Sequence, residues 1–162
     1  MKLAVLVVED EAPVRAALAR DLAPFASTVR IEMAEDVEDA KAVVKEIVED
    51  GDVVALILSD HRLPGVSGVD FLIETAKDPR LSKSRKVLVT GQAGHEDTIR
   101  AINLAQINHY VAKPWHPELL QMTVRSQLTD FVLDNDIKPL PHLAALDPAR
   151  AMDSMRLNTD AW

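Results

Sequence analysis

The sequence predicts an α/β fold in which helices cover both faces of a five-stranded parallel sheet, a doubly wound arrangement. Two observations predict it. Short apolar runs alternate five times with longer segments of helical periodicity, and consecutive parallel strands need right-handed crossovers. Hydrophobic residues make up 48% of the chain but aromatic residues only 4%, which is typical of aliphatic parallel strands under Ala-rich helices.

The five expected strands are runs of four to six residues, too short for helices and mostly rich in β-branched residues. Three of them are strongly apolar: Leu3–Val8, Val53–Leu58 and Lys86–Thr90. Two are weaker: Thr28–Met33 and His109–Ala112. Because each run is followed by a helical pattern, we expect the order strand–helix to repeat five times.

Five segments have the apolar spacing of helices: Ala12–Leu22, Val37–Val48, Gly68–Ala76, His95–Leu104, and a long one from Pro117 to about Asn135. Start and stop signals support these limits. Asp36 can cap the second helix, Pro117 suits the first turn of the fifth, and Asp78 before Pro79 ends the third.

The 162 residues suffice for one domain with an appendage. We expect a domain at 1–130, and at 131–162 the end of the last helix followed by a tail. Three prolines make this tail a linker with at most one short helix, near Asp147–Arg156.

The last helix is expected to extend past the sheet and to present apolar residues there, among them Phe131, Val132 and Leu133. Two covers are possible. One is a homodimer through the last helices, and the other is the tail folding back with Leu140, Leu143 and Leu146. The sequence favours the dimer, because prolines make the tail poor at forming a regular covering element.

Charge and composition exclude several classes of protein. A formal net charge of −8 argues against direct binding of nucleic acid, which needs a basic face. With no cysteine there is neither a disulfide framework nor a thiolate zinc site. No apolar run approaches the roughly 20 residues of a membrane span, and the amino terminus lacks the pattern of a secretory signal. We therefore expect a soluble, cytoplasmic protein.

Polar residues stand where four of the expected strands end. Glu9 and Asp10 follow the first strand, and Asp60 follows the third closely. Thr90 ends the fourth, and Lys113 follows the fifth. Because the functional crevice of an open α/β sheet lies beyond the carboxyl ends of its strands, we expect these side chains to share one site.

Three carboxylates held together repel one another and gain protons unless a cation neutralises them. Mg²⁺ suits such an all-oxygen site, which it completes with water and phosphate oxygens. The carboxylate of Asp60 could then attack phosphorus, while Lys113 and the Thr90 hydroxyl stabilise the equatorial oxygens. The product would be an aspartyl phosphate.

Taken singly, each of these residues has an ordinary structural explanation. Acids at strand ends often cap helices or lie solvated in loops, and a lone Asp such as Asp60 is more often structural than nucleophilic. Thr90 before Gly91 could be a turn residue, and Lys113 a plain strand terminus. Their occurrence at the ends of the first, third, fourth and fifth strands together favours a reaction site.

Four stretches resemble the receiver domains of two-component response regulators: VLVVEDE, LILSDHRLPGVSG, VLVTGQ and YVAKPW. The resemblance covers about residues 1–130 and includes the spacing from Asp60 to Gly68. It implies a flavodoxin-like fold with strand order 2-1-3-4-5.

The resemblance also implies a role for each site residue. Asp60 would be the phosphoacceptor and a metal ligand. The further Mg²⁺ ligands would be Glu9, Asp10 and the backbone carbonyl of Arg62. Thr90 and Lys113 would bind the phosphoryl oxygens, and Tyr110 matches an aromatic switch position. The Lys113–Pro114 bond is expected to be cis.

The implied function is a signalling switch and not an enzyme, since the domain would catalyse only its own phosphorylation and dephosphorylation. A sensor histidine kinase or a phosphotransfer protein would donate to Asp60. The resulting change would appear on the face of the fourth helix, fifth strand and fifth helix, which Thr90 and Tyr110 border. Arg62 and Gln92 flank the path of a hydrolytic water, so we expect slow dephosphorylation.

Two other functions remain open on the sequence. A phosphatase with an aspartyl nucleophile would need a second acid close after Asp60, and Arg62 occupies that position. A pseudo-receiver would bind partners without being phosphorylated. Such proteins usually lack the Asp, the acid pair or the Lys, and all are present here.

Overall fold

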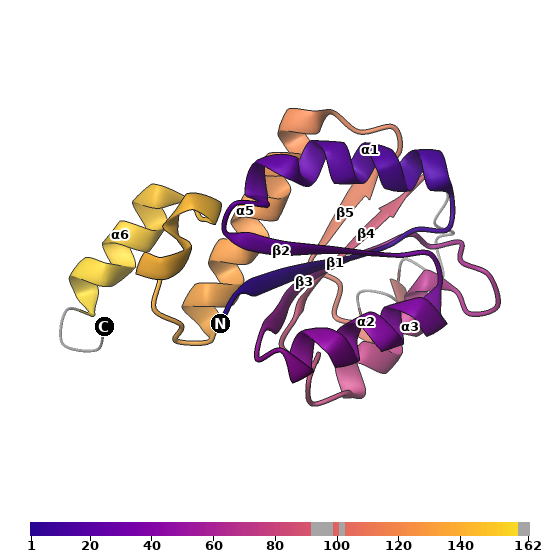
Figure 1. Cartoon of the computed structure of the whole chain (residues 1–162), viewed down its shortest axis with the longest axis horizontal. Coiled ribbons are helices and arrows are strands. Elements are labelled where there is room, and N and C mark those ends of the chain that lie inside the picture. Colours follow the sequence, from indigo (N-terminus) through magenta and orange to yellow (C-terminus); the bar gives the residue numbers. More distant parts are fainter. Residues whose placement is uncertain (92–98, 101–102, 159–162) are drawn as a thin grey trace.

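The fold is a parallel sheet between two layers of helices, seen in a computed structural model that describes residues 1–91, 99–100 and 103–158 (Figure 1). The strands are β1 (Leu3–Val8), β2 (Val29–Ala34), β3 (Val53–Ser59), β4 (Arg85–Thr90) and β5 (His109–Ala112). All pairings are parallel and the order is β2-β1-β3-β4-β5. The predicted doubly wound fold and its strand order are confirmed.

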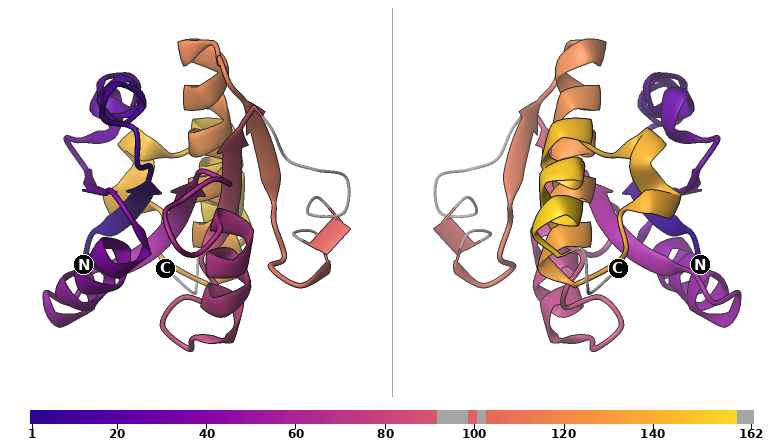
Figure 2. Two further views of the ribbon diagram at one scale, coloured as in Figure 1. Left: turned by 90° about the vertical axis from the view of Figure 1, so that its right-hand side faces the viewer. Right: turned by 90° about the vertical axis from the view of Figure 1, so that its left-hand side faces the viewer.

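Helices α1 (Ala12–Leu22) and α5 (Pro117–Asp134) cover one face, and α2 (Val37–Glu49) and α3 (Gly68–Lys77) cover the other (Figures 1 and 2). The interior strand β1 is fully buried, and its side chains pack into both helix layers because successive side chains point to opposite faces. Leu3, Val5 and Val7 pack under α1 and α5, whereas alternate residues pack under α2 and α3. This accounts for the continuous apolar run in the sequence.

Local signals set the helix ends as expected. The Asp36 side chain accepts a hydrogen bond from the Asp39 amide at 2.7 Å and caps α2. Ser67 caps α3 by accepting from the Asp70 amide. Of the helix expected at His95–Leu104, residues 99–100 and 103 are helical and Leu104 lies in a turn, while its other positions lie outside the described residues.

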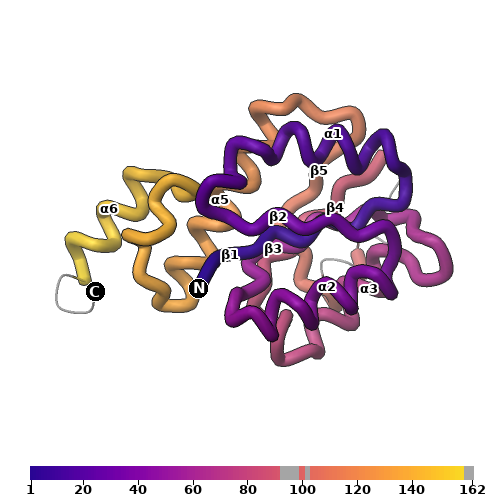
Figure 3. Tube along the Cα trace, viewed as in Figure 1, coloured from indigo at the N-terminus to yellow at the C-terminus, as the bar shows by residue number. Residues whose placement is uncertain are grey.

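The C-terminal segment folds back along α5 (Figures 1 and 3). It contains a 3₁₀ helix, η2 (Leu140–Ala145), and α6 (Pro148–Leu157), which matches the one short helix expected in the tail. Arg125 of α5 donates to the carbonyl oxygens of Ala144 and Leu146 at 3.0 and 3.1 Å. The Asp147 amide donates to Thr129 Oγ1 at 2.9 Å.

The C-terminal segment itself covers the apolar end of the last helix, which is the second of the two covers that the sequence leaves open, and not the favoured dimer. Phe131 is 3% exposed and Val132 is fully buried, in one core cluster with Ala145, Leu146 and Ala151 of the C-terminal segment. Local patterns favour a second subunit as the cover, but hydrogen bonds with the side chains of Arg125 and Thr129 hold the irregular tail in place. The reason for expecting a dimer through the last helix is thereby removed.

None of the helices within the described ranges combines the length and apolar character that crossing a membrane requires.

Candidate phosphoacceptor and metal site

The carboxyl ends of β1 and β3 bring three acids together. Ligand oxygens of Glu9, Asp10 and Asp60 all lie within 4.8 Å of one another. Glu9 and Asp60 are buried at 1% and 6% exposure, whereas Asp10 is exposed. Two buried carboxyl groups and a third at the surface form a cluster that is open on one side.

The backbone around Asp60 is fixed from three directions. Its amide donates to the carbonyl of Val8, the last residue of β1, at 3.0 Å, which continues the β1–β3 pairing past the end of β3. Its carbonyl accepts from the Ser59 hydroxyl at 3.0 Å. The next residue, His61, accepts from the Gly68 amide at 2.7 Å, which closes the loop onto the start of α3.

Lys113, directly after β5, bridges two of the acids. Its Nζ lies 3.1 Å from Glu9 Oε2 and 3.3 Å from Asp60 Oδ2. Burial alone would lower the pKa of Lys113, but the hydrogen bond to Glu9 and the charges of Glu9 and Asp60 together raise it. The ammonium is therefore charged at neutral pH. The peptide bond from Lys113 to Pro114 is cis.

A single ammonium leaves the acid cluster under-neutralised. The pKa of Glu9 is raised to about 7, because burial and the charge of Asp60, which raise it, outweigh the Lys113 hydrogen bond, which lowers it. Such a site favours a further positive charge, and its all-oxygen donor set is the one that Mg²⁺ prefers. The residues present therefore fit a magnesium ion.

A cavity of about 310 Å³ opens beside Asp60 and is lined by Glu11, Asp60, Arg62, Thr90, Gly91 and Lys113. Thr90 is the last residue of β4, so its side chain faces the same opening as Lys113. Arg62 lines the cavity two residues after Asp60. Gln92, the other residue expected to flank the site, lies outside the described residues.

Tyr110 lies on β5 at the wall of a second hollow of about 390 Å³, formed by β5, the loop after it and α5. Leu119 and Met122 also line this hollow and are 57% and 65% exposed. The hollow is thus an apolar surface beside the strand that carries the expected aromatic switch.

Sequence reasoning missed Arg15, on the first turn of α1. Its Nη1 donates to the backbone carbonyls of Glu9 and Asp10 at 2.9 and 3.2 Å, which holds the acid pair in place. The position of Arg15 shortly after the acid pair does not by itself predict this contact, because a long flexible side chain can reach many partners.

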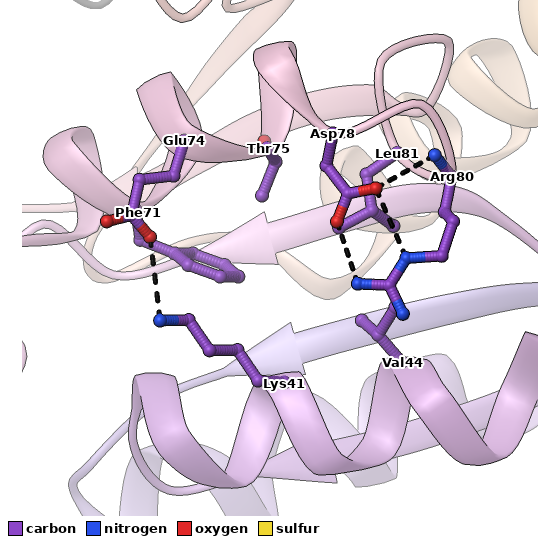
Figure 4. A pocket seen from close by; sticks show the side chains of 8 residues that line it. All are labelled: Lys41, Val44, Phe71, Glu74, Thr75, Asp78, Arg80 and Leu81. Atoms are coloured by element: carbon purple, nitrogen blue, oxygen red, sulfur yellow. Dashed lines mark hydrogen bonds and ion pairs between the residues drawn. The ribbon is translucent and has the colours of Figure 1, made fainter.

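A smaller cavity of about 50 Å³ lies between α2 and α3 (Figure 4). An ion pair of 3.7 Å joins Lys41 to Glu74 across its mouth, and Arg80 pairs with Asp78 beside it. It contains none of the acids at the strand ends, and its charged groups are paired with one another. We assign no function to it.

Comparison with known proteins gives the family. The model of the response regulator receiver domain matches residues 5–125. The chain is 33% identical over 136 residues to the hydrogenase transcriptional regulatory protein HoxA of Cupriavidus necator, covering 84% of this chain and 26% of that protein. It is 28% identical over 122 residues to the phosphate regulon transcriptional regulatory protein PhoB of Escherichia coli, covering 75% of this chain and 50% of that protein. The chain thus spans between a quarter and a half of these relatives.

Solved structures share the fold. The signal receiver domain of an HD domain-containing protein from Pseudomonas fluorescens Pf-5 superimposes with a TM-score of 0.72 at 21% identity, covering 83% of this chain and 93% of that one. A CheY-like receiver domain protein from Methanospirillum hungatei JF-1 gives 0.70 at 22% identity, covering 83% and 99%. With the family match, the strand order and the acid cluster together, the chain belongs to the response regulator receiver domain family of two-component signalling.

Proposed function

We propose that this receiver is a phosphorylation switch in which Asp60 accepts a phosphoryl group from a phosphohistidine of a sensor histidine kinase or phosphotransfer protein. One observation carries the proposal. Three carboxylates lie within 4.8 Å of one another, and Lys113 contacts both Glu9 and Asp60. This arrangement joins a nucleophile to a charged group that can receive phosphoryl oxygens.

In this proposal the metal ligands are Glu9, Asp10, Asp60 and the backbone carbonyl of Arg62. Bound Mg²⁺ would neutralise the acids and offset the charge on the phosphoryl oxygens. The raised pKa of Glu9, to about 7, supports a site that is short of positive charge.

In the transfer step, a carboxylate oxygen of Asp60 forms a bond to phosphorus while the bond from phosphorus to the donor imidazole breaks. The imidazole nitrogen keeps the electron pair. Lys113 Nζ, 3.3 Å from Asp60 Oδ2, binds one phosphoryl oxygen, and the Thr90 hydroxyl binds another. The domain would catalyse only this step and the later hydrolysis.

We infer that phosphorylation changes the conformation first at Thr90 and then at Tyr110, and that the change alters the apolar hollow beside β5 and α5. A phosphoryl group gives Thr90 a contact that exists in one state only, which is what a population shift requires. The exposed Leu119 and Met122 offer a surface on which a partner protein or output module can dock.

Residues 1–130 would carry the phosphoacceptor chemistry, and residues 131–162 would form the end of the last helix and the tail that covers it. A homodimer through the last helix is not needed to bury Phe131 and Val132, because both are buried within the chain. The net charge of −8 supports a domain that controls another protein and does not itself bind nucleic acid. The domain would act in the cytoplasm, where the kinase phosphorylates it.

Acetyl phosphate and Mg²⁺ test this function directly, with the phosphorylated species separated on a phosphate-affinity gel. Wild type should be retarded, and omission of Mg²⁺ should abolish the shift. Asp60→Asn should show no shift, whereas the exposed Asp153→Asn on α6 should behave as wild type. Equal retardation of Asp60→Asn would assign the phosphoryl group to another residue.

A further inference from the structure

A buried carboxylate on α1 contacts the loop that carries Lys113. Asp21 is 5% exposed and lies one residue before the end of α1. Its Oδ2 accepts a hydrogen bond of 2.8 Å from the indole Nε1 of Trp115. Its Oδ1 accepts a bond of 3.0 Å from Arg20. Each oxygen therefore has a donor, as a buried carboxylate requires.

The contact is a strong one. Arg20 lowers the pKa of Asp21, burial opposes this, and the Trp115 hydrogen bond lowers it further, so the carboxylate is charged at neutral pH. Hydrogen bonds to an ionised acceptor are about twice as strong as those between neutral groups. The Arg20 side chain is 72% exposed, whereas Trp115 is partly buried, so the indole is the less exposed of the two donors.

A second contact joins the same two parts of the chain. Gln121 of α5 donates from Nε2 to the backbone carbonyl of Asp21 at 2.9 Å. The Trp115 ring also packs against the core formed by α1, α5 and the sheet. The end of α1 thus contacts the loop between β5 and α5 through the Asp21 side chain, and the first turns of α5 through the Asp21 backbone.

Lys113 stands two residues before Trp115, with Pro114 between them. Because the proline ring fixes its own φ, little freedom separates the position of the indole from that of the Lys113 backbone. The ammonium of Lys113 must lie within hydrogen-bond reach of both Glu9 and Asp60, at 3.1 and 3.3 Å. A small displacement of the loop would therefore move the Lys113 ammonium, which receives the phosphoryl oxygens, out of its position.

We propose that Asp21 and Trp115 are positioning residues for phosphoryl transfer, because their hydrogen bond fixes the loop that places Lys113 beside Asp60. The inference rests on the proposed function of Asp60. It assigns to the end of α1, opposite the site, a part in setting the rate of phosphorylation. The metal ligands come from other strands and are not held by this bond.

The experiment separates the transfer rate from metal binding. Phosphorylation by acetyl phosphate is timed at saturating Mg²⁺, and the Mg²⁺ dissociation constant is measured by calorimetry on the same variants. Trp115→Phe keeps an aromatic ring without the donor, and it should lower the rate on the order of tenfold with unchanged Mg²⁺ affinity. Asp21→Leu should do the same, whereas Asp21→Asn keeps an acceptor oxygen and should restore most of the rate.

Two matched controls exclude a general loss of stability. Arg20→Ala removes the other donor to the same carboxylate and should keep the wild-type rate. Leu22→Ala opens the core next to Asp21, at a fully buried residue, and should lower the melting temperature without slowing transfer.

A wild-type rate in Trp115→Phe would overturn the inference and leave the proposed function intact. An equal loss of rate in Leu22→Ala, or a parallel loss of Mg²⁺ affinity in Trp115→Phe, would also overturn it. Wild type that is not phosphorylated at all would instead refute the proposed function, so the two failures are distinguishable.

Discussion

Gly68, the first residue of α3, lies directly against the backbone of Asp60: a Cβ atom at Gly68 would stand 1.7 Å from the Asp60 carbonyl oxygen. That distance is far inside van der Waals contact, and the obstructing atom is backbone. The glycine is thus needed for its lack of a side chain, and its position sets how closely α3 approaches the proposed phosphoacceptor.

Gly68→Ala should therefore displace Asp60, lower the free energy of unfolding by about 1–3 kcal/mol and slow phosphorylation. Urea unfolding and acetyl phosphate labelling measure the two effects. Gly91→Ala is the control for stability, because a Cβ there would meet its nearest atom at an ordinary 3.6 Å. If Gly68→Ala unfolds at the same urea concentration as wild type, the close contact with Asp60 is not a real constraint.

Because of Lys86, the free energy of unfolding should change with pH in the alkaline range. Its side chain is 1% exposed, and its Nζ donates to the Ser84 carbonyl at 3.0 Å. Burial, together with the charge of Arg85, lowers the pKa of Lys86 from 10.5 to about 8. Between these two values the unfolded chain binds a proton that the folded chain has lost, so stability rises with pH there.

Lys86→Met removes this titration while keeping a similar volume. Below pH 8 the free energy of unfolding of the variant should exceed that of wild type by a few kcal/mol, since one pKa unit corresponds to about 1.4 kcal/mol. This difference should shrink as the pH rises towards 10.5. Urea unfolding from pH 7 to 10 measures it. A gain that is constant across this range would show that Lys86 stays charged in the folded protein.

The C-terminal segment should stabilise the domain as a monomer. Ala151 is fully buried on α6, whereas its neighbour Met152 is 56% exposed. Ala151→Asp should detach α6 and lower the free energy of unfolding by more than about 2 kcal/mol, and Met152→Asp should stay within about 0.5 kcal/mol of wild type. Wild type should scatter light as a single chain of 17.8 kDa. Equal effects of the two variants, or a wild-type dimer, would contradict the packing of this segment on α5.

Arg62 should prolong the phosphorylated state. It lines the cavity beside Asp60, where its long side chain can crowd the approach of water to phosphorus. Arg62→Ala should shorten the lifetime of phospho-Asp60 several-fold, measured as decay after removal of acetyl phosphate. Arg156→Ala, at an exposed position of α6, serves as the control. A lifetime that is unchanged or longer in Arg62→Ala would exclude this role.

The sheet and the gathering of polar residues at its edge could be predicted because both follow from local pattern and one topological rule. Apolar runs mark β1, β3 and β4, and parallel strands place their carboxyl ends together. Glu9, Asp60 and Lys113 are far apart in sequence but follow β1, β3 and β5. In the sheet β1 lies beside β3, and β3 and β5 both lie beside β4. The edge strand β2 was displaced by one residue in the prediction, since most of it is only half-buried and its pattern is weak.

The specific hydrogen-bond partners of long side chains could not be predicted. Nothing in the local pattern says that Arg15 holds the acid pair, or that Asp21 accepts from Trp115. The same holds for the cover of α5. The apolar residues Phe131 and Val132 indicate that something must bury them, but whether a second subunit or Leu146 does so depends on hydrogen bonds that form only in the folded chain.

The identity of the phosphorylated residue is the central claim, and chemical trapping tests it most directly. Borohydride reduces an aspartyl phosphate to homoserine, which marks the modified position permanently. After treatment with acetyl phosphate and Mg²⁺, peptide mass spectrometry should find homoserine at position 60 and at no other aspartate. Homoserine at position 10, or its absence from a protein that carries phosphate, would contradict the assignment of Asp60 as phosphoacceptor.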